Sequence, residues 1–392
     1  MKKTNHLEVI GILSLSFLLT SNYAVSSCLP EMMKTFEGYD RTKVDFLISC
    51  PSMAMMVMIA LTPILSRFLK ERFTVITALL LMGGCGIVPV FTTSYPLILA
   101  SRLLMGVGTG LLNAKAVSLI GERFTGSQRS RLQGIRCSME TIGQSSLMLV
   151  AGQFLRFGWN YAFMVYATAF AILIMYLTFV PANKQASAKL PNGNETRSHT
   201  PYTAKHKMII LSNFLLGMAL VSAAVLLSMR VTTYVVETGI GSDVNGATIL
   251  SVSVFVGFFG GLVFGKWYEL LKQMVLPLGL MIITIGMVTI GFAGNLLTVA
   301  IGACLCNFGV TLSTSYMFNG LSEYLPIETL HTSNALVLIG CNLGSWTISF
   351  VLKVIAMIHP SVSAGFITYA VLFAALAAMF FVKYHIHNRR TA

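Results

Sequence analysis

Long apolar stretches recur twelve times along the chain, and they constrain its fold more than any other feature. A helix that crosses the hydrocarbon of a bilayer needs about 20 mostly apolar residues, and each stretch meets or approaches that length. The predicted spans lie near residues 8–29, 44–64, 73–92, 96–119, 133–155, 160–181, 207–234, 245–264, 274–293, 295–319, 333–357 and 361–383. Barrel strands would show short alternating segments, which are absent. The sequence therefore predicts an all-α membrane protein with twelve transmembrane helices.

Composition supports a lipid environment. Hydrophobic residues make up 55% of the 392 residues, and charged residues only 10%, against about 25% in ordinary soluble domains. So little charge cannot cover a soluble fold of this size. The composition argues against a secreted disulfide scaffold, a disordered chain and a soluble nucleic-acid binder.

The net charge of +13 is explained by membrane topology. With the N-terminus inside the cell, 18 of the 27 basic residues fall on the cytoplasmic side, and only Lys34, Arg41, Lys43 and Arg156 fall outside. This asymmetry is the one that sets orientation in membrane proteins. We therefore expect a multi-pass protein of the cell membrane with both termini in the cytoplasm.

The chain divides into two halves that resemble each other. Residues 182–206 are polar and basic, which predicts a cytoplasmic linker between a six-helix bundle at 1–181 and another at 207–392. An offset of 201 residues pairs Gly108 with Gly309, Glu122 with Glu323, and Gly143 with Gly344, and an offset of 199 pairs Arg67 with Lys266. Duplicated bundles of this kind build a binding site between the halves and open it to alternate sides.

Two stretches carry a family resemblance. Residues 62–72 contain Arg67, Lys70 and Arg72 where the major facilitator superfamily has Gly-x-x-x-Asp-Arg-x-Gly-Arg-Arg, although the acid is missing. Residues 101–110 fit the Arg-x-x-x-Gly-x-Gly pattern of its fourth span. The chain thus resembles a twelve-span member of this superfamily. The fifth span lacks the Gly-Pro pair of the family's antiporters, which weakens a prediction of drug export.

The resemblance implies roles for several residues. It places Arg102 in the central cavity and links it to proton coupling. It also implies a cytoplasmic latch in which the acid at Glu122 pairs with basic residues of the loop. The predicted gating residues are Arg67, Lys70, Arg72, Glu122, Lys266 and Glu323.

Charges inside the spans are costly and therefore point to function. The basic residues within or near the ends of spans are Arg102, Lys115, Arg136, Arg230 and Lys353, and Glu140 is taken as the only deep acid. Arg136 and Glu140 are four residues apart and can pair on one helix face. Glu140 is the predicted proton carrier, with a fixed ion pair as the equal alternative. Arg230 either lines the cavity or extends to the membrane surface, whereas Lys353 is expected to extend to the surface.

A polar stripe marks the predicted cavity wall. Arg102, Gly106, Thr109 and Asn113 share one face of the fourth span at helical spacing. The full set predicted to contact substrate is Asn22, Ser26, Arg102, Thr109, Asn113, Arg136, Arg230, Asn307, Thr311 and Trp346.

These features predict a secondary active transporter for a small organic solute, with proton coupling expected and no cofactor. No phosphate-binding loop, metal cluster or serine-hydrolase motif is present in the sequence. Export of amphipathic compounds is the first expectation. Uptake or exchange of an organic anion is the alternative, because Arg102, Arg136 and Arg230 outnumber Glu140. An enzyme acting on lipid-linked substrates is disfavoured because the outer acids form no motif. The protein is expected to be a monomer whose partners are its solute, protons and the bilayer.

Overall fold

The computed structural model describes residues 6–65, 71–124, 126–181, 204–324 and 327–391, and these residues form helices without any strand. The first bundle contains α1 (His6–Ser16), η1 (Ser21–Tyr23), η2 (Ser26–Cys28), α2 (Leu29–Thr35), α3 (Arg41–Leu65), α4 (Glu71–Gly86), α5 (Val88–Phe91), α6 (Tyr95–Arg123), α7 (Gly126–Phe154), η3 (Leu155–Phe157), η4 (Trp159–Ala167) and α8 (Thr168–Phe179). The second contains α9 (Ala204–Glu237), α10 (Asp243–Leu271), η5 (Lys272–Met274), α11 (Val275–Gly291), α12 (Leu296–Tyr324), α13 (Ile327–Ile358) and α14 (Ala364–Thr391).

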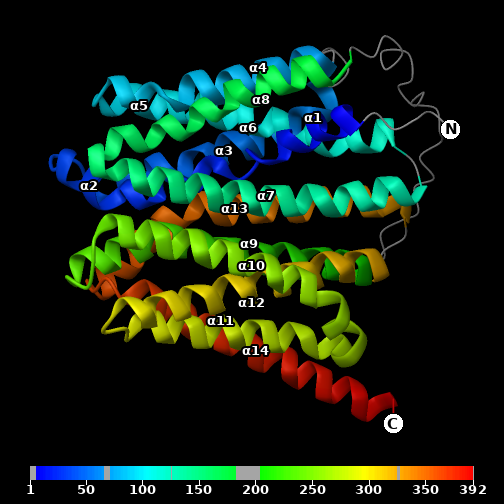
Figure 1. Ribbon diagram of the computed structural model, residues 1–392. Helices are drawn as coiled ribbons and strands as arrows, with labels where there is room; N and C mark the ends of the chain where they lie inside the picture. The colour runs from blue at the N-terminus through cyan, green and yellow to red at the C-terminus, as the bar shows by residue number, and fades with distance from the viewer. Residues whose placement is uncertain (1–5, 66–70, 125, 182–203, 325–326, 392) are drawn as a thin grey trace.

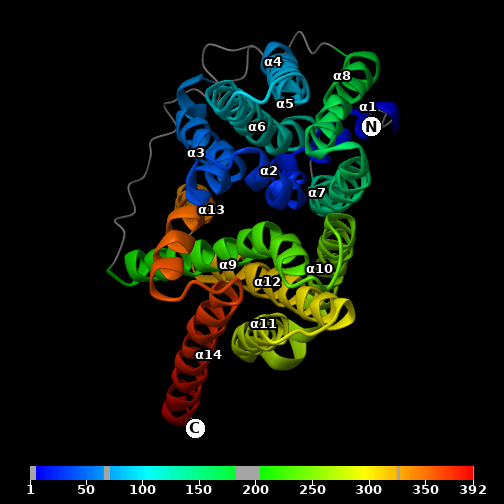
Figure 2. The same ribbon diagram turned by 90° about the vertical axis from the view of Figure 1, so that its left-hand side faces the viewer.

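The long helices run roughly side by side, so that the molecule has two ends (Figure 1, Figure 2). The beginning of α1 and the end of α14 lie at the same end, which we call the terminal end. The opposite end, where α3 begins and α9 and α13 finish, is called the distal end. The predicted linker lies largely outside the described residues, and α9 begins at Ala204.

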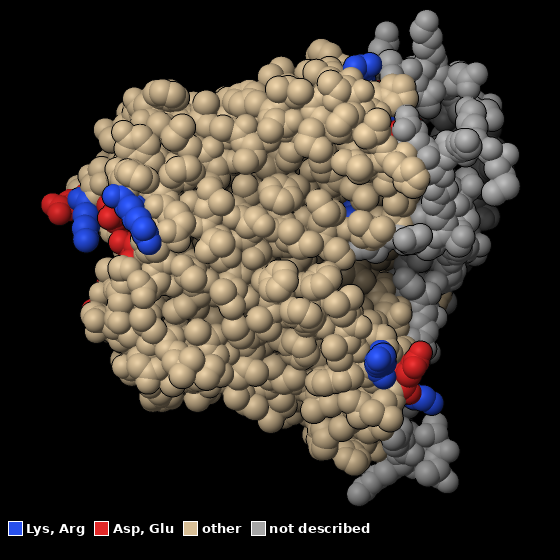
Figure 3. All heavy atoms as spheres, in the orientation of Figure 1, with Lys and Arg blue, Asp and Glu red and all other residues tan. Residues whose placement is uncertain are grey.

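The helices are long and apolar enough to cross a membrane. Within the described residues, nine helical segments meet this criterion, or ten if the bent pair His6–Ser16 and Ser21–Thr35 is one span. The segment Asp243–Gly291 among them holds both α10 and α11. The polar helix α7 is not among them. Figure 3 shows a broad band free of charged side chains between charged residues at the two ends. The fold is therefore that of an all-α membrane protein.

The first predicted span, 8–29, is not one continuous helix. α1 ends at Ser16, and two short 3-10 turns follow before α2 begins at Leu29. The halves of the span meet at a bend of 46°. Serine and asparagine side chains offer the backbone alternative hydrogen bonds and so weaken a regular helix. This break exposes backbone carbonyls in the core of the bundle, where other groups can use them.

The pairing of glycines at an offset of 201 residues has a counterpart in the packing. A Cβ at Gly108 would lie 2.8 Å from the backbone oxygen of Ala78, and a Cβ at Gly309 would lie 2.8 Å from that of Gly279. The two contacted residues are themselves 201 apart. Both bundles thus use glycine at the same place to bring two helices into backbone contact.

The two bundles are joined at several points in the distal half of the molecule. Ser145 of α7 and Ser251 of α10 exchange hydrogen bonds from hydroxyl to backbone oxygen, at 2.9 and 2.7 Å. The hydroxyls of Ser49 on α3 and Ser349 on α13 lie 2.9 Å apart. These contacts close the distal side of the space between the bundles.

Candidate functional site

Arg102 is fully enclosed in the first bundle. Its exposed fraction is 0%. The guanidinium donates from Nε to the backbone oxygen of Leu47 at 3.0 Å, from Nη1 to the hydroxyl of Tyr166 at 3.0 Å, and from Nη2 to the backbone oxygen of Asn22 at 2.8 Å. It therefore ties α6 to α3, to η4 and to the break that follows α1.

One carbonyl acceptor of Arg102, that of Asn22, comes from the broken first span. Asn22 lies in η1, and its side-chain oxygen accepts a hydrogen bond from Thr109 at 3.1 Å. Tyr166 donates onward to the backbone oxygen of Ser21 at 3.0 Å. The ring of Phe163 lies 5.7 Å from the guanidinium carbon, close enough for a cation–π contact. The structure thus brings together three predicted residues, Arg102, Asn22 and Thr109, in a closed cluster.

Arg136 and Glu140 form the predicted pair on α7. The nearest nitrogen and oxygen are 3.2 Å apart, and the side chains are 15% and 25% exposed. Ile142 and Leu149 are exposed on α7, and helical geometry places them about 160° and 180° around the helix from Glu140. Leu147, about two turns beyond Glu140, is buried. Glu140 therefore points away from the apolar outer face of α7 and into the bundle interior.

The other predicted cavity residues are dispersed. Asn307 donates from its amide nitrogen to the hydroxyl of Ser253 at 2.9 Å, which links α12 to α10. Thr311 donates to the backbone oxygen of Asn307 at 3.0 Å. The Nε1 atom of Trp346 is buried, and among the described residues it has no hydrogen-bond partner.

Two more of the predicted cavity positions lie in the first bundle. Ser26 is buried in η2, and its hydroxyl has no hydrogen-bond partner among the described residues. Asn113 on α6 is half-buried. The predicted residues therefore do not form a single cluster in this conformation.

Most of the side chains predicted to form the cytoplasmic latch lie outside the part of the chain that the structure describes. Arg67 and Lys70 lie outside the described residues, as do the side chains of Glu122 and Glu323. Of the others, Arg72 donates to the backbone oxygen of Leu177 at 3.2 Å, and Lys266 is exposed.

Arg123, which was not predicted, forms ion pairs with Glu8 and Glu71 near the terminal end. Burial opposes the charged form of Arg123, but its hydrogen bonds and the two carboxylates outweigh burial and raise its pKa. The three residues link α6 to α1 and α4.

The sequence analysis missed that Asp45 is buried. It was counted among the acids of the outer loops, but it lies in α3 near the distal end and is enclosed by protein. Asp45 is 1% exposed on α3 and forms an ion pair with Arg230 of α9, which is 7% exposed. Arg230 is therefore buried against a counter-charge. The sequence did contain a pattern that could have predicted this burial. Arg41, Asp45, Ser49 and Ser52 are spaced three or four residues apart, which places these polar residues on one face of a helix.

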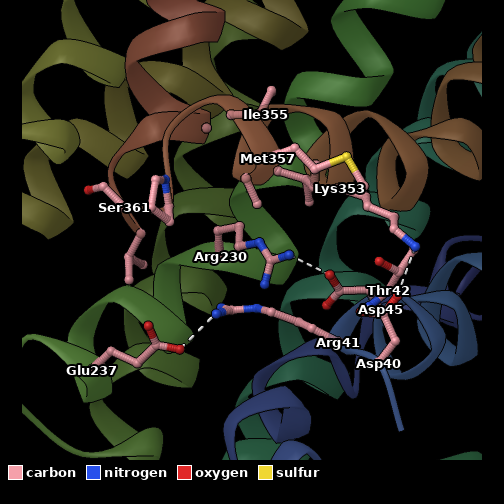
Figure 4. Close-up of a pocket in the computed structure, with 15 residues that line it drawn as sticks. Asp40, Arg41, Thr42, Asp45, Arg230, Glu237, Lys353, Ile355, Met357 and Ser361 are labelled. Carbon is pink, nitrogen blue, oxygen red and sulfur yellow. Dashed lines mark hydrogen bonds and ion pairs between the residues drawn. The ribbon is translucent and has the colours of Figure 1, made fainter.

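The Asp45–Arg230 pair lies beside a cavity of about 390 Å³ at the distal end (Figure 4). Two more ion pairs line the same cavity: Arg41 with Glu237 at 3.1 Å, and Lys353 with Asp40 at 2.9 Å. The hydrogen bond from Lys353 lowers the pKa of Asp40 below its ordinary value. The side chain of Lys353 is 43% exposed in this pair.

Comparison with known proteins decides the family. The sequence profile of the Major Facilitator Superfamily matches residues 11–349. The chain belongs to the major facilitator superfamily. No curated protein sequence matches the chain. This superfamily membership makes the chain a multi-pass membrane protein of a transporter family, as the resemblance implied, and supports a secondary transporter.

Solved structures share the superfamily fold with this chain. A crystal structure of a D-xylose–proton symporter is similar with a TM-score of 0.75 at 15% identity, covering 96% of this chain and 97% of the symporter. The E. coli xylose transporter in an inward open conformation has a TM-score of 0.72 at 15% identity, covering 95% of this chain and 94% of that one. Its partially occluded inward open form has a TM-score of 0.73 at 16% identity, covering 96% and 97%. At these identities the likeness concerns the fold.

Proposed function

We propose that the protein is a proton-coupled secondary transporter that moves a small organic solute across the cell membrane by alternating access. In the sequence, 18 of the 27 basic residues fall on the predicted cytoplasmic side, which supports a cytoplasmic location for the terminal end. The distal end then faces outward. The hydrogen bonds Ser49–Ser349 and Ser145–Ser251 hold the bundles together on that side, so the conformation described is closed to the outside.

The observation that carries the proposal is the Arg136–Glu140 pair on α7. Two charged side chains on a helix packed among apolar spans are costly unless they serve a site in the interior. The pair points away from the exposed apolar face of α7, and Glu140 keeps a quarter of its side chain exposed. A carboxylate that is accessible in the interior and held by one arginine can exchange its partner for a proton. Glu140 is therefore the proposed proton carrier.

Arg102 has a supporting role in this proposal. Its carbonyl and hydroxyl partners hold it in place without a carboxylate among the described hydrogen bonds. It contributes a fixed positive charge to the bundle that contains Glu140.

Export of an amphipathic compound is the first proposal for substrate and direction. The anion alternative loses part of its basis, because Asp45 compensates Arg230 and Glu140 compensates Arg136. Of the three buried arginines counted in the sequence, Arg102 alone retains an excess charge. Uptake or exchange of an organic anion stays the second proposal.

Proton coupling is tested in proteoliposomes that contain a trapped pH-sensitive dye. Ethidium, benzoate and D-xylose represent an amphipathic cation, an organic anion and the sugar class of the structurally similar symporters. We expect one of these classes to move protons in the native protein. Glu140→Gln should abolish accumulation driven by a pH gradient while downhill exchange of the same solute persists. The control is Glu37→Gln, which removes an exposed acid. Gradient-driven flux that survives in Glu140→Gln would remove Glu140 from this role.

Direction is tested in intact cells. Cells that express the native protein should retain less ethidium than cells that express Glu140→Gln if the protein exports amphipathic compounds. Greater accumulation of radiolabelled benzoate in the native cells would instead support the anion alternative.

A further inference from the structure

The face of α3 toward the second bundle carries a polar seam, which consists of Arg41, Asp45, Ser49 and Ser52. The spacing of three or four residues keeps these side chains on one helix face. Three of them contact the second bundle: Arg41 contacts Glu237, Asp45 contacts Arg230, and Ser49 contacts Ser349. The seam begins at the distal surface and continues about two to three turns into the span.

Charges alternate across the distal end of this seam. The first bundle presents Asp40, Arg41 and Asp45, with signs minus, plus and minus. The second bundle presents the opposite signs in Lys353, Glu237 and Arg230, and each residue pairs with its opposite. All six line one cavity, as Figure 4 shows for the labelled side chains. The two surfaces are therefore complementary in charge, and their three ion pairs are formed in this arrangement, where the distal side is closed.

The inner pair differs from the outer two in burial. The Lys353–Asp40 side chains are 43% and 47% exposed, whereas the Arg230 and Asp45 side chains are 8% and 2% exposed. Exposed pairs contribute little because water solvates the separated ions almost as well. Removing one member of a buried pair leaves the other charge without compensation, which is strongly unfavourable. Asp45 and Arg230 therefore decide the closure of this end.

The buried pair is incompletely satisfied. Oδ1 of Asp45 and Nη1 of Arg230 are buried without a hydrogen-bond partner among the described residues. A buried pair stabilises a structure only when its remaining donors and acceptors are also bonded. Water that entered from the adjacent cavity would satisfy both atoms once the helices parted. The closed and open arrangements are thus closer in free energy than for a fully bonded pair.

We propose that Asp45 and Arg230 form the distal gate of this transporter. The two residues pair across the bundles when the distal side is closed, and they separate and become hydrated when it opens. The Ser49–Ser349 hydrogen bond, one turn deeper on α3, breaks in the same movement. This assignment rests on the proposed alternating-access function, and it makes Asp45 and Arg230 positioning residues for the transport cycle.

A cysteine in the cavity reports on the gate without any substrate. Leu352 is buried and lines the cavity, so Leu352→Cys should react slowly with a membrane-impermeant maleimide while the gate is closed. The same protein without Leu352→Cys measures the background from native cysteines. Labelling is done on intact cells, and thermal unfolding of each purified variant identifies any that fail to fold.

Asp45→Asn and Arg230→Gln should each make Leu352→Cys react several-fold faster, because each leaves one buried charge unpaired. The double variant removes both charges, and its labelling should return toward the parent rate. Lys353→Gln, which breaks only an exposed pair, should label at the parent rate. Single variants that label like the parent, or a double variant that labels as fast as the singles, would overturn the gate.

The outcomes separate the gate from the proposed function. If the labelling pattern holds and Glu140→Gln retains gradient-driven flux, the gate stands and the proposed proton carrier is wrong. If Glu140→Gln behaves as proposed and labelling is unchanged in the single variants, Asp45 and Arg230 are structural residues and the gate lies elsewhere.

Discussion

Gly143 of α7 lies directly against the backbone of Phe17, so closely that a Cβ at this position would overlap the carbonyl of Phe17. The same contact occurs in the second bundle, where Gly344 of α13 meets the carbonyl of Met218. Both glycines and both carbonyl-bearing residues are 201 positions apart. The first span of each bundle thus packs on a glycine of the fifth span.

Gly143→Ala and Gly344→Ala should each destabilise the protein. The added methyl group must displace a backbone carbonyl, and overpacking of this kind costs about 1–3 kcal/mol. We expect the thermal unfolding midpoint in detergent to fall by several degrees for each variant. Gly84→Ala is the matched control, because a Cβ there meets nothing within 4 Å. A midpoint for Gly143→Ala equal to that of the control would show that α1 moves aside without cost.

Arg102 should not tolerate replacement by lysine. The planar guanidinium donates hydrogen bonds to Leu47, Asn22 and Tyr166 at the same time, and the single amine of lysine cannot reproduce this geometry. Buried acceptors would be left unpaired, at about 1–3 kcal/mol each. We expect Arg102→Lys to lower the unfolding midpoint and to abolish transport. Arg156→Lys, at an exposed position, serves as the control.

Tyr166→Phe is a smaller change in the same cluster, because it removes only one hydroxyl group. It removes one acceptor of Arg102 and the donor to Ser21, while the ring that packs near the guanidinium is kept. The expected loss is about 1–2 kcal/mol of unfolding free energy, smaller than for Arg102→Lys. An equal or larger loss would mean that the hydroxyl, rather than the guanidinium, holds the break in α1.

A substitution at Gly152 tests the closure of the distal side independently of the ion pairs. A Cβ at Gly152 of α7 would overlap the Cβ of Ala247 on α10. Gly152→Ala should therefore weaken closure and increase maleimide labelling of Leu352→Cys. Adding Ala247→Gly removes the overlapping methyl group and should restore slow labelling. Labelling that stays fast in the double variant would show that the effect of Gly152→Ala is not steric.

Much of the fold follows from local sequence patterns. The apolar stretches predicted helices that the structure contains, because bilayer thickness fixes their length and the helix is the form in which such a continuous apolar stretch satisfies its own backbone in lipid. The pairing of Arg136 with Glu140 was predicted because both lie on one helix, four residues apart. The equivalent positions of the paired glycines could be predicted because a repeat in the sequence indicates a repeat in the fold.

Contacts between distant elements were harder to predict. Asp45 lies close to the start of α3, where a lone acid is typical of a loop, and its partner is 185 residues away. The acceptors that enclose Arg102 are mainly backbone carbonyls, which no residue type marks. The carbonyl of Asn22 became available because the first span breaks after α1, and that break was not predicted. Burial at a helix end and the exposure of carbonyls at a break depend on tertiary packing.

The polar seam on α3 makes the two bundles evolutionarily interdependent. Asp45 pairs with Arg230, which is 185 positions away in the chain, and Ser49 forms a hydrogen bond with Ser349, which is 300 positions away. Both partners lie in the opposite bundle. A change of sign at Asp45 is tolerable only with a matching change on α9. Although each bundle has its own glycine contacts, one bundle could be exchanged for the equivalent bundle of a relative only if the partners of α3 in the other bundle were exchanged with it.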